Sequence, residues 1–158
     1  MAIAIGSRVT ESIFTPKSPF FLWARVAAWC GVIYYFSSRP NYEGIVPDLE
    51  TLRGILQILF RKSCHLGEYA VLMVLTRRAV EGSRAAQVPG LLLFSYLFVL
   101  LYAVSDEWHQ TFVFGRDGSP SDVFIDSIGA AAGYFFCQWK DRRAHEKEKN
   151  QNPQNLEN

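Results

Sequence analysis

Cysteine is scarce in this chain, and the few cysteines present form no recognisable motif. Cys30, Cys64 and Cys137 are widely separated, and each lies in or beside an apolar segment. Because no CxxC pair or metal-ligand spacing occurs, we interpret them as small buried apolar side chains. The sequence therefore argues against a metal site built from cysteines and against a disulfide framework.

Net charge is almost absent as well. Lys and Arg number 16 against 15 Asp and Glu, which gives a formal charge of +1. Nucleic-acid binding requires positive charge to neutralise phosphates, so we expect no nucleic-acid partner. No internal repeat is evident, and a length of 158 residues indicates one domain.

Aromatic residues are missing from the C-terminal segment, although the rest of the chain is rich in them. All 12 Phe, 4 Trp and 7 Tyr precede residue 140. This segregation predicts a cytoplasmic leader over residues 1–19, a membrane domain over 20–139, and a polar, disordered cytoplasmic tail over 140–158.

Apolar segments within the central region predict an all-α membrane protein, a bundle of four transmembrane helices. We expect the first segment to be retained as a span, because Arg25 interrupts it and no small-residue cleavage pattern follows. The segment 49–60 has apolar residues at helical spacing and predicts a short amphipathic helix at the membrane interface. The predicted spans are 20–36, 63–75, 90–110 and 119–139.

Positive residues are distributed unevenly around these spans. Ten Lys and Arg residues lie in the leader, in the loop after the second span and in the tail, against five in the segments on the other side. Lys and Arg are enriched in cytoplasmic loops. We therefore predict a multi-pass protein of the cytoplasmic membrane with both termini inside.

Polar residues gather where the third and fourth spans approach the outer side. On a helix, Asp106 shares a face with His109 and Gln110. In the fourth span, Asp122 and Asp126 share a face that continues to Gly129 and Gly133. Two glycines four residues apart predict close packing against a neighbouring helix.

A short turn between these spans should bring their polar ends together. Arg116 lies in that turn, and Lys62, His65 and Tyr69 come from the start of the second span. Crowded carboxylates repel one another unless a cation compensates them. We therefore predict an outward pocket in which Arg116 binds a carboxylate and His65 or His109 lies within reach of one.

Several motifs together resemble the VanZ-like family of small bacterial membrane proteins. They are FSSRP after the first span, RKSCHLGEYAVLMVLTRR in the second, and LYAVSDEWHQTFVFGRDGSPSDVFIDSIGAAAG across the last two. The family is named after a teicoplanin-resistance protein, so the resemblance implies a protein of the bacterial inner membrane and cell envelope linked to glycopeptide resistance. Arg39 stands where the family tends to have Gln. The motif positions implied are Lys62, His65, Tyr69, Asp106, Glu107, His109, Gln110, Arg116, Asp122, Asp126 and Gly129.

Three functions fit these residues. The first is a binding protein whose pocket holds a lipid headgroup, a lipid-linked cell-wall precursor or a glycopeptide-related ligand, through Lys62, Tyr69, Gln110, Arg116, Asp122 and Asp126. The second is a hydrolase or transferase acting on a lipid-linked phosphate, with catalytic candidates His65, Asp106, Glu107 and His109. The third is a structural bundle whose polar network only fixes helix packing.

A divalent cation is the one cofactor that the residue types suggest. Oxygen-rich ligand sets favour Mg²⁺, Mn²⁺ or Ca²⁺. The candidate metal ligands are Asp106, Glu107, His109, Asp122 and Asp126.

Overall fold

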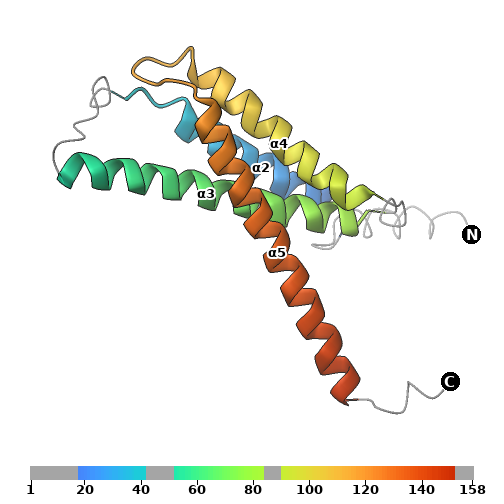
Figure 1. The fold of residues 1–158 in the computed structure, drawn as a ribbon. Coiled ribbons are helices and arrows are strands. Elements are labelled where there is room, and N and C mark those ends of the chain that lie inside the picture. Colours follow the sequence, from blue (N-terminus) through green and yellow to red (C-terminus); the bar gives the residue numbers. More distant parts are fainter. Residues whose placement is uncertain (1–17, 42–51, 84–89, 152–158) are drawn as a thin grey trace, which may run out of the picture.

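A computed structural model describes residues 18–41, 52–83 and 90–151 of the chain (Figure 1). These residues form four helices and no strand, so the all-α prediction is confirmed for this part of the chain. The helices are α2 (Pro19–Ser37), α3 (Leu52–Glu81), α4 (Leu91–Gln110) and α5 (Pro120–Gln151). Most of the predicted leader, the segment 42–51 and the last residues of the tail lie outside the described residues.

Helix α2 begins at Pro19, whose fixed backbone angle suits the first helical position. Within the described residues, α2 is the one helix long and apolar enough to cross a membrane, judged by length and composition alone. It coincides with the first predicted span. The other three spans, and with them the four-span bundle, stay a prediction.

Helix α3 is continuous from Leu52 to Glu81. The prediction of a separate amphipathic helix over 49–60 was therefore wrong, although its residues from Leu52 onward are helical. The expected break was placed at Arg61 and Lys62, but both residue types are good helix formers, and their charge alone does not end a helix. For the same reason the helix passes through Arg77 and Arg78.

Helix α5 starts at the predicted cap. Ser119 Oγ accepts a hydrogen bond from the backbone N–H of Ser121 at 3.2 Å, and Pro120 occupies the first helical position. The helix then continues to Gln151, where we expected disorder soon after Trp139. Arg77 supports this extension, since its side chain donates to Asp141 Oδ2 at 2.6 Å.

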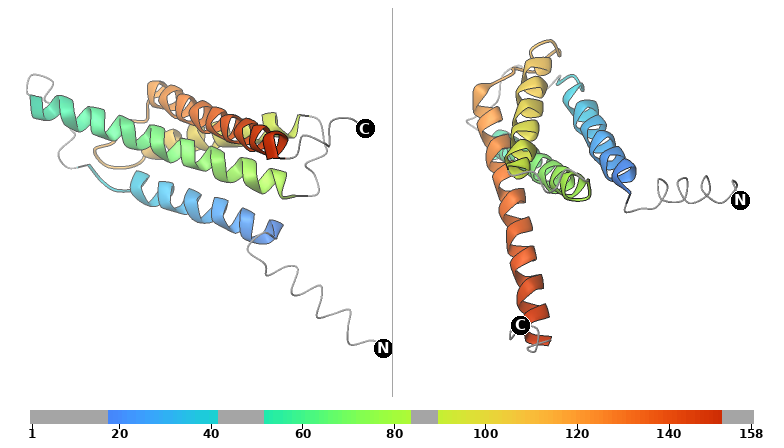
Figure 2. Two further views of the ribbon diagram at one scale, coloured as in Figure 1. Left: turned by 90° about the horizontal axis from the view of Figure 1, so that it is seen from below. Right: turned by 90° about the vertical axis from the view of Figure 1, so that its right-hand side faces the viewer.

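The closest packing in the bundle is between α3 and α5, and two glycines make it possible. A Cβ atom at Gly129 would overlap the backbone carbonyl of Leu66, and one at Gly133 would overlap that of Ala70. Both glycines thus lie directly against a neighbouring helix, as their spacing predicts. Beyond this contact the C-terminal turns of α5 project away from the other helices (Figures 1 and 2).

Aromatic side chains connect the remaining helices. Trp29 Nε1 of α2 donates to the carbonyl of Glu68 at 2.9 Å, and Tyr102 of α4 donates to the carbonyl of Cys30 at 2.6 Å. Tyr96 of α4 donates to the carbonyl of Ser127 in α5 at 3.2 Å. Buried aromatic residues with a polar group commonly find such partners. These bonds join α2 to α3 and to α4, and α4 to α5.

Candidate functional site

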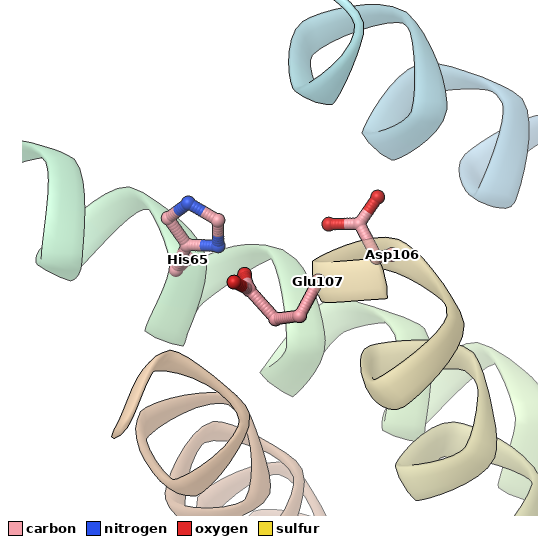
Figure 3. Close-up of side chains that lie close together, drawn as sticks. All are labelled: His65, Asp106 and Glu107. Atoms are coloured by element: carbon pink, nitrogen blue, oxygen red, sulfur yellow. The ribbon is translucent and has the colours of Figure 1, made fainter. Parts of the chain in front are cut away.

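Three side chains from two helices converge at one end of the bundle. His65 comes from α3, and Asp106 and Glu107 come from α4; a possible ligand atom from each lies within 4.8 Å of the other two. Figure 3 shows both carboxylates turned toward the imidazole ring. We call His65, Asp106, Glu107 and the neighbouring Asp126 the acidic cluster.

The two carboxylates from α4 are buried and held in place by neighbouring donors. Asp106 and Glu107 are each 4% exposed. The side-chain amide of Gln110 donates to Asp106 Oδ2 at 3.1 Å and to Glu107 Oε1 at 3.0 Å. The backbone N–H of Ser119 donates to Glu107 Oε2 at 2.9 Å. Side chains of adjacent residues point in different directions from a helix. The shared donor Gln110 brings the carboxylates of Asp106 and Glu107 to the same side of α4.

Asp126 brings a third helix to the cluster. It is fully buried, and its Oδ1 lies 3.5 Å from Nδ1 of His65. Neither of its oxygens, nor His65 Nδ1, has a hydrogen-bond partner among the described residues. The hydroxyl of the fully buried Tyr69, one turn after His65, also has none. The expectation that a histidine lies within reach of a carboxylate is confirmed by His65.

Arg116 approaches the cluster but does not bind a carboxylate, so that part of the prediction was wrong. Its guanidinium donates to the carbonyls of Arg39 at 3.1 Å and Phe36 at 2.9 Å, and to Gln110 Oε1 at 3.4 Å. Gln110 stands between the guanidinium and the carboxylates. Burial lowers the pKa of Arg116, but an arginine remains protonated at neutral pH.

The position of Arg116 depends on the glycine before it. Gly115 has a φ of 71°, and a Cβ atom there would overlap the backbone carbonyl of Asn41. The backbone N–H of Asn41 donates to the carbonyl of Phe114 at 3.1 Å. The turn after α4 is thus joined to the segment after α2, which explains why Arg116 reaches the end of α2.

His109 lies on a different face of α4 from the cluster. Its ring is 4.7 Å from that of Tyr34, and its Nε2 is 3.0 Å from Ser38 Oγ. The Ser38 hydroxyl already donates to the carbonyl of Tyr34, so His109 Nε2 is the donor to Ser38. His109 therefore joins α4 to α2, and our grouping of it with the acidic residues was wrong. His109 lies two residues after Glu107, which is about 200° of helix rotation, so the two side chains leave α4 on nearly opposite sides.

Asp122 is also separate from the cluster. It forms an ion pair of 2.5 Å with Lys62, which links the start of α5 to α3. Both side chains are partly exposed, at 18% and 36%. The two candidate binding residues thus neutralise each other.

A cavity of about 540 Å³ lies beside the cluster, between α2, α3 and the turn that carries Arg116. One part of its lining is apolar and includes Ile33, Phe36 and Phe60. The other part is ionisable and comprises Arg39, Arg61, Arg116, His65, Glu68 and Asp106.

Sequence reasoning did not assign Glu68, Arg39 or Arg61 to the site. Glu68 lies in α3, three residues after His65, and helical spacing could have suggested it. Arg39 could have been found only from the FSSRP motif, because nothing in its spacing relates it to the cluster. Its guanidinium lies over the ring of Tyr35 at 4.5 Å.

Comparison with known protein families decides the assignment. A sequence model of the VanZ/LLP1 family matches residues 20–141. The chain belongs to the VanZ/LLP1 family. No curated protein and no solved structure matches the chain. The match to VanZ/LLP1 includes all but the first residue of α2, all of α3 and α4 and most of α5, so every residue of the cluster and cavity lies within the matched region.

Proposed function

We propose that this VanZ/LLP1 protein is a membrane protein of the bacterial cell envelope whose cavity binds the negatively charged phosphate headgroup of an anionic lipid. The observation that carries the proposal is the composition of the cavity wall, in which three arginines stand beside an apolar surface. A lipid phosphate requires both, because the charged oxygens need donors and the attached chain needs an apolar path.

The arginines have donors available for such a ligand. Arg116 uses three of its N–H groups on Arg39, Phe36 and Gln110, and an arginine has five. The side chain of Arg61 makes no hydrogen bond or ion pair with the described residues. A guanidinium offers a planar fork that matches two phosphate oxygens.

The outer surface of the bundle supports a membrane setting. Large apolar side chains are exposed on α2, α4 and α5. Exposing this much apolar surface to water is unfavourable, whereas contact with lipid chains is not. They include Tyr34, Phe94, Leu97, Leu101, Phe124, Ile128 and Phe135. If α2 crosses the membrane with its N-terminus in the cytoplasm, the cavity beside its C-terminal end faces the outer leaflet.

Lipid binding to the purified full-length protein tests the proposal. Native mass spectrometry in detergent would compare two anionic lipids, phosphatidylglycerol and a polyprenyl phosphate, with phosphatidylcholine, whose choline group balances the charge of its phosphate. We expect the first or second lipid to be retained at least ten-fold more than phosphatidylcholine, and their ratio distinguishes a bulk phospholipid from a cell-wall carrier lipid. Arg61→Gln should remove this preference, whereas Arg78→Gln, an exposed arginine at the other end of α3, should not. Equal retention of all three lipids would reject the proposal.

A hydrolase or transferase acting on a lipid-linked phosphate is the second candidate. The pair of His65 with the buried Asp126 favours it, because a carboxylate beside an imidazole can orient it as a general base. Release of inorganic phosphate from a polyprenyl diphosphate, lost in His65→Gln and retained in His109→Gln, would establish it. Binding without turnover would leave the first function.

A further inference from the structure

The acidic cluster contains more negative charge than its neighbours compensate. Asp106, Glu107 and Asp126 are buried, and within the cluster His65 is the single side chain that can be positive. The nearest lysine, Lys62, is paired with Asp122, and Arg116 is separated from the carboxylates by Gln110. Buried carboxylates without a cation are costly, because burial removes the water that would solvate them.

Unpartnered atoms mark the place where a cation would relieve this cost. Both oxygens of Asp126 and the Nδ1 of His65 are buried without a hydrogen bond to any residue that the structure describes. Asp126 is fully buried, and its Oδ1 faces that nitrogen in a long ion pair of 3.5 Å, which leaves Oδ2 with no hydrogen bond from a described residue. In native proteins such groups usually have a partner, and an ion that is not a protein atom is one explanation.

We infer that His65, Asp106 and Glu107 bind a divalent metal ion, with Asp126 within reach as a fourth ligand. The ligand atoms of the first three lie within 4.8 Å of one another. Ligand atoms around one ion are about 3 to 4 Å apart when each bond is about 2.1 Å long, so a small closure completes the site. One imidazole nitrogen among carboxylate oxygens suits Mn²⁺ or Zn²⁺ better than a soft metal.

Neighbouring residues hold the proposed metal ligands in fixed orientations. Carboxylates that bind a metal usually also accept hydrogen bonds from neighbouring residues, which orient them. Here Gln110 donates to both Asp106 and Glu107. Two of the ligands, His65 and Asp106, also line the cavity. The ion would therefore meet a phosphate held by the arginines, although metal binding itself does not require the lipid.

Metal titration of the full-length protein in detergent tests the inference. After treatment with EDTA and its removal, Mn²⁺ would be added and free Mn²⁺ followed by electron paramagnetic resonance, with Zn²⁺ as competitor. We expect about one ion per chain and a melting temperature that rises with metal concentration, because the ion joins α3, α4 and α5. His65→Gln and Asp126→Asn should weaken binding at least ten-fold.

Two variants serve as matched controls. His109→Gln and Asp122→Asn remove the same residue types from the same ends of α4 and α5, but outside the cluster, and should bind Mn²⁺ like the wild type. Wild-type protein that binds neither Mn²⁺ nor Zn²⁺ would overturn the inference even if a variant fails to fold, and so would unchanged binding in folded His65→Gln. Retention of lipid in EDTA, measured separately, tests the cavity proposal independently of the metal.

Discussion

Arg116 donates to the side-chain oxygen of Gln110 at 3.4 Å, and through this amide it is connected to two buried carboxylates. The amide nitrogen of Gln110 donates to both Asp106 and Glu107. One neutral side chain thus separates the permanent cation from the acidic cluster. This arrangement keeps the guanidinium available to the cavity, where a direct ion pair would have consumed its donors.

Gln110→Leu should destabilise the protein, because it leaves two buried carboxylates without their shared donor. Leaving a buried polar group unsatisfied costs about 1–3 kcal/mol, so the free energy of unfolding should fall by at least that amount. Gln57→Leu, an exposed glutamine of α3, is the control and should change little. Denaturant unfolding in detergent measures both. Equal effects of the two substitutions would contradict the role of Gln110.

Gly133→Ala should weaken the contact between α3 and α5. The added methyl group would overlap the carbonyl of Ala70, and overpacking costs about 1–3 kcal/mol. Gly67→Ala tests the same substitution within a helix where nothing lies within 4 Å of the new atom. It should be neutral or stabilise the protein by up to about 1 kcal/mol, because alanine favours a helix over glycine. Thermal unfolding of the two variants would show opposite shifts; a stable Gly133→Ala variant would refute the close approach.

Gly115→Ala should impair the cavity by displacing Arg116. Both Gly115 and Gly90 have positive φ angles, of 71° and 87°, so alanine at either position carries about 1–2 kcal/mol of backbone strain. At Gly115 the methyl group would also overlap Asn41, whereas at Gly90 none of the described residues would lie within 4 Å of it. We expect Gly115→Ala to lose the preference for anionic lipids over phosphatidylcholine and Gly90→Ala to keep it. The lipid-retention measurement decides this, and an unaffected Gly115→Ala variant would argue against Arg116 as a ligand.

Membrane topology can be tested by cysteine labelling. After replacement of Cys30, Cys64 and Cys137 by alanine, single cysteines would be placed at Asp117 and Gln151. The excess of Lys and Arg near the termini predicts that a membrane-impermeant maleimide labels position 117 on intact cells and position 151 only after permeabilisation. Labelling of both positions from outside would rule out two cytoplasmic termini.

The sequence by itself determined the helical class, the start of α5 and the packing glycines. Local chemistry is sufficient for these features. The Ser119–Pro120 cap is read from neighbouring residues, and the four-residue spacing of Gly129 and Gly133 places both on one face of whichever helix contains them. Helix ends were less predictable, since the charged residues at Arg61 and Lys62 resemble a boundary but continue the helix.

Only the tertiary structure decided which polar residues meet. His65 and His109 are the same residue type near predicted span ends, yet one faces Asp126 and the other faces Ser38, directly after α2. The partner of each histidine depends on how α2, α3 and α5 pack around α4. The spacing of residues along one helix does not contain this information. The same is true of Arg116, whose partners lie at the end of α2 because the turn at Gly115 packs against Asn41. Side-chain faces follow from helical geometry, but the neighbour on each face follows from long-range packing.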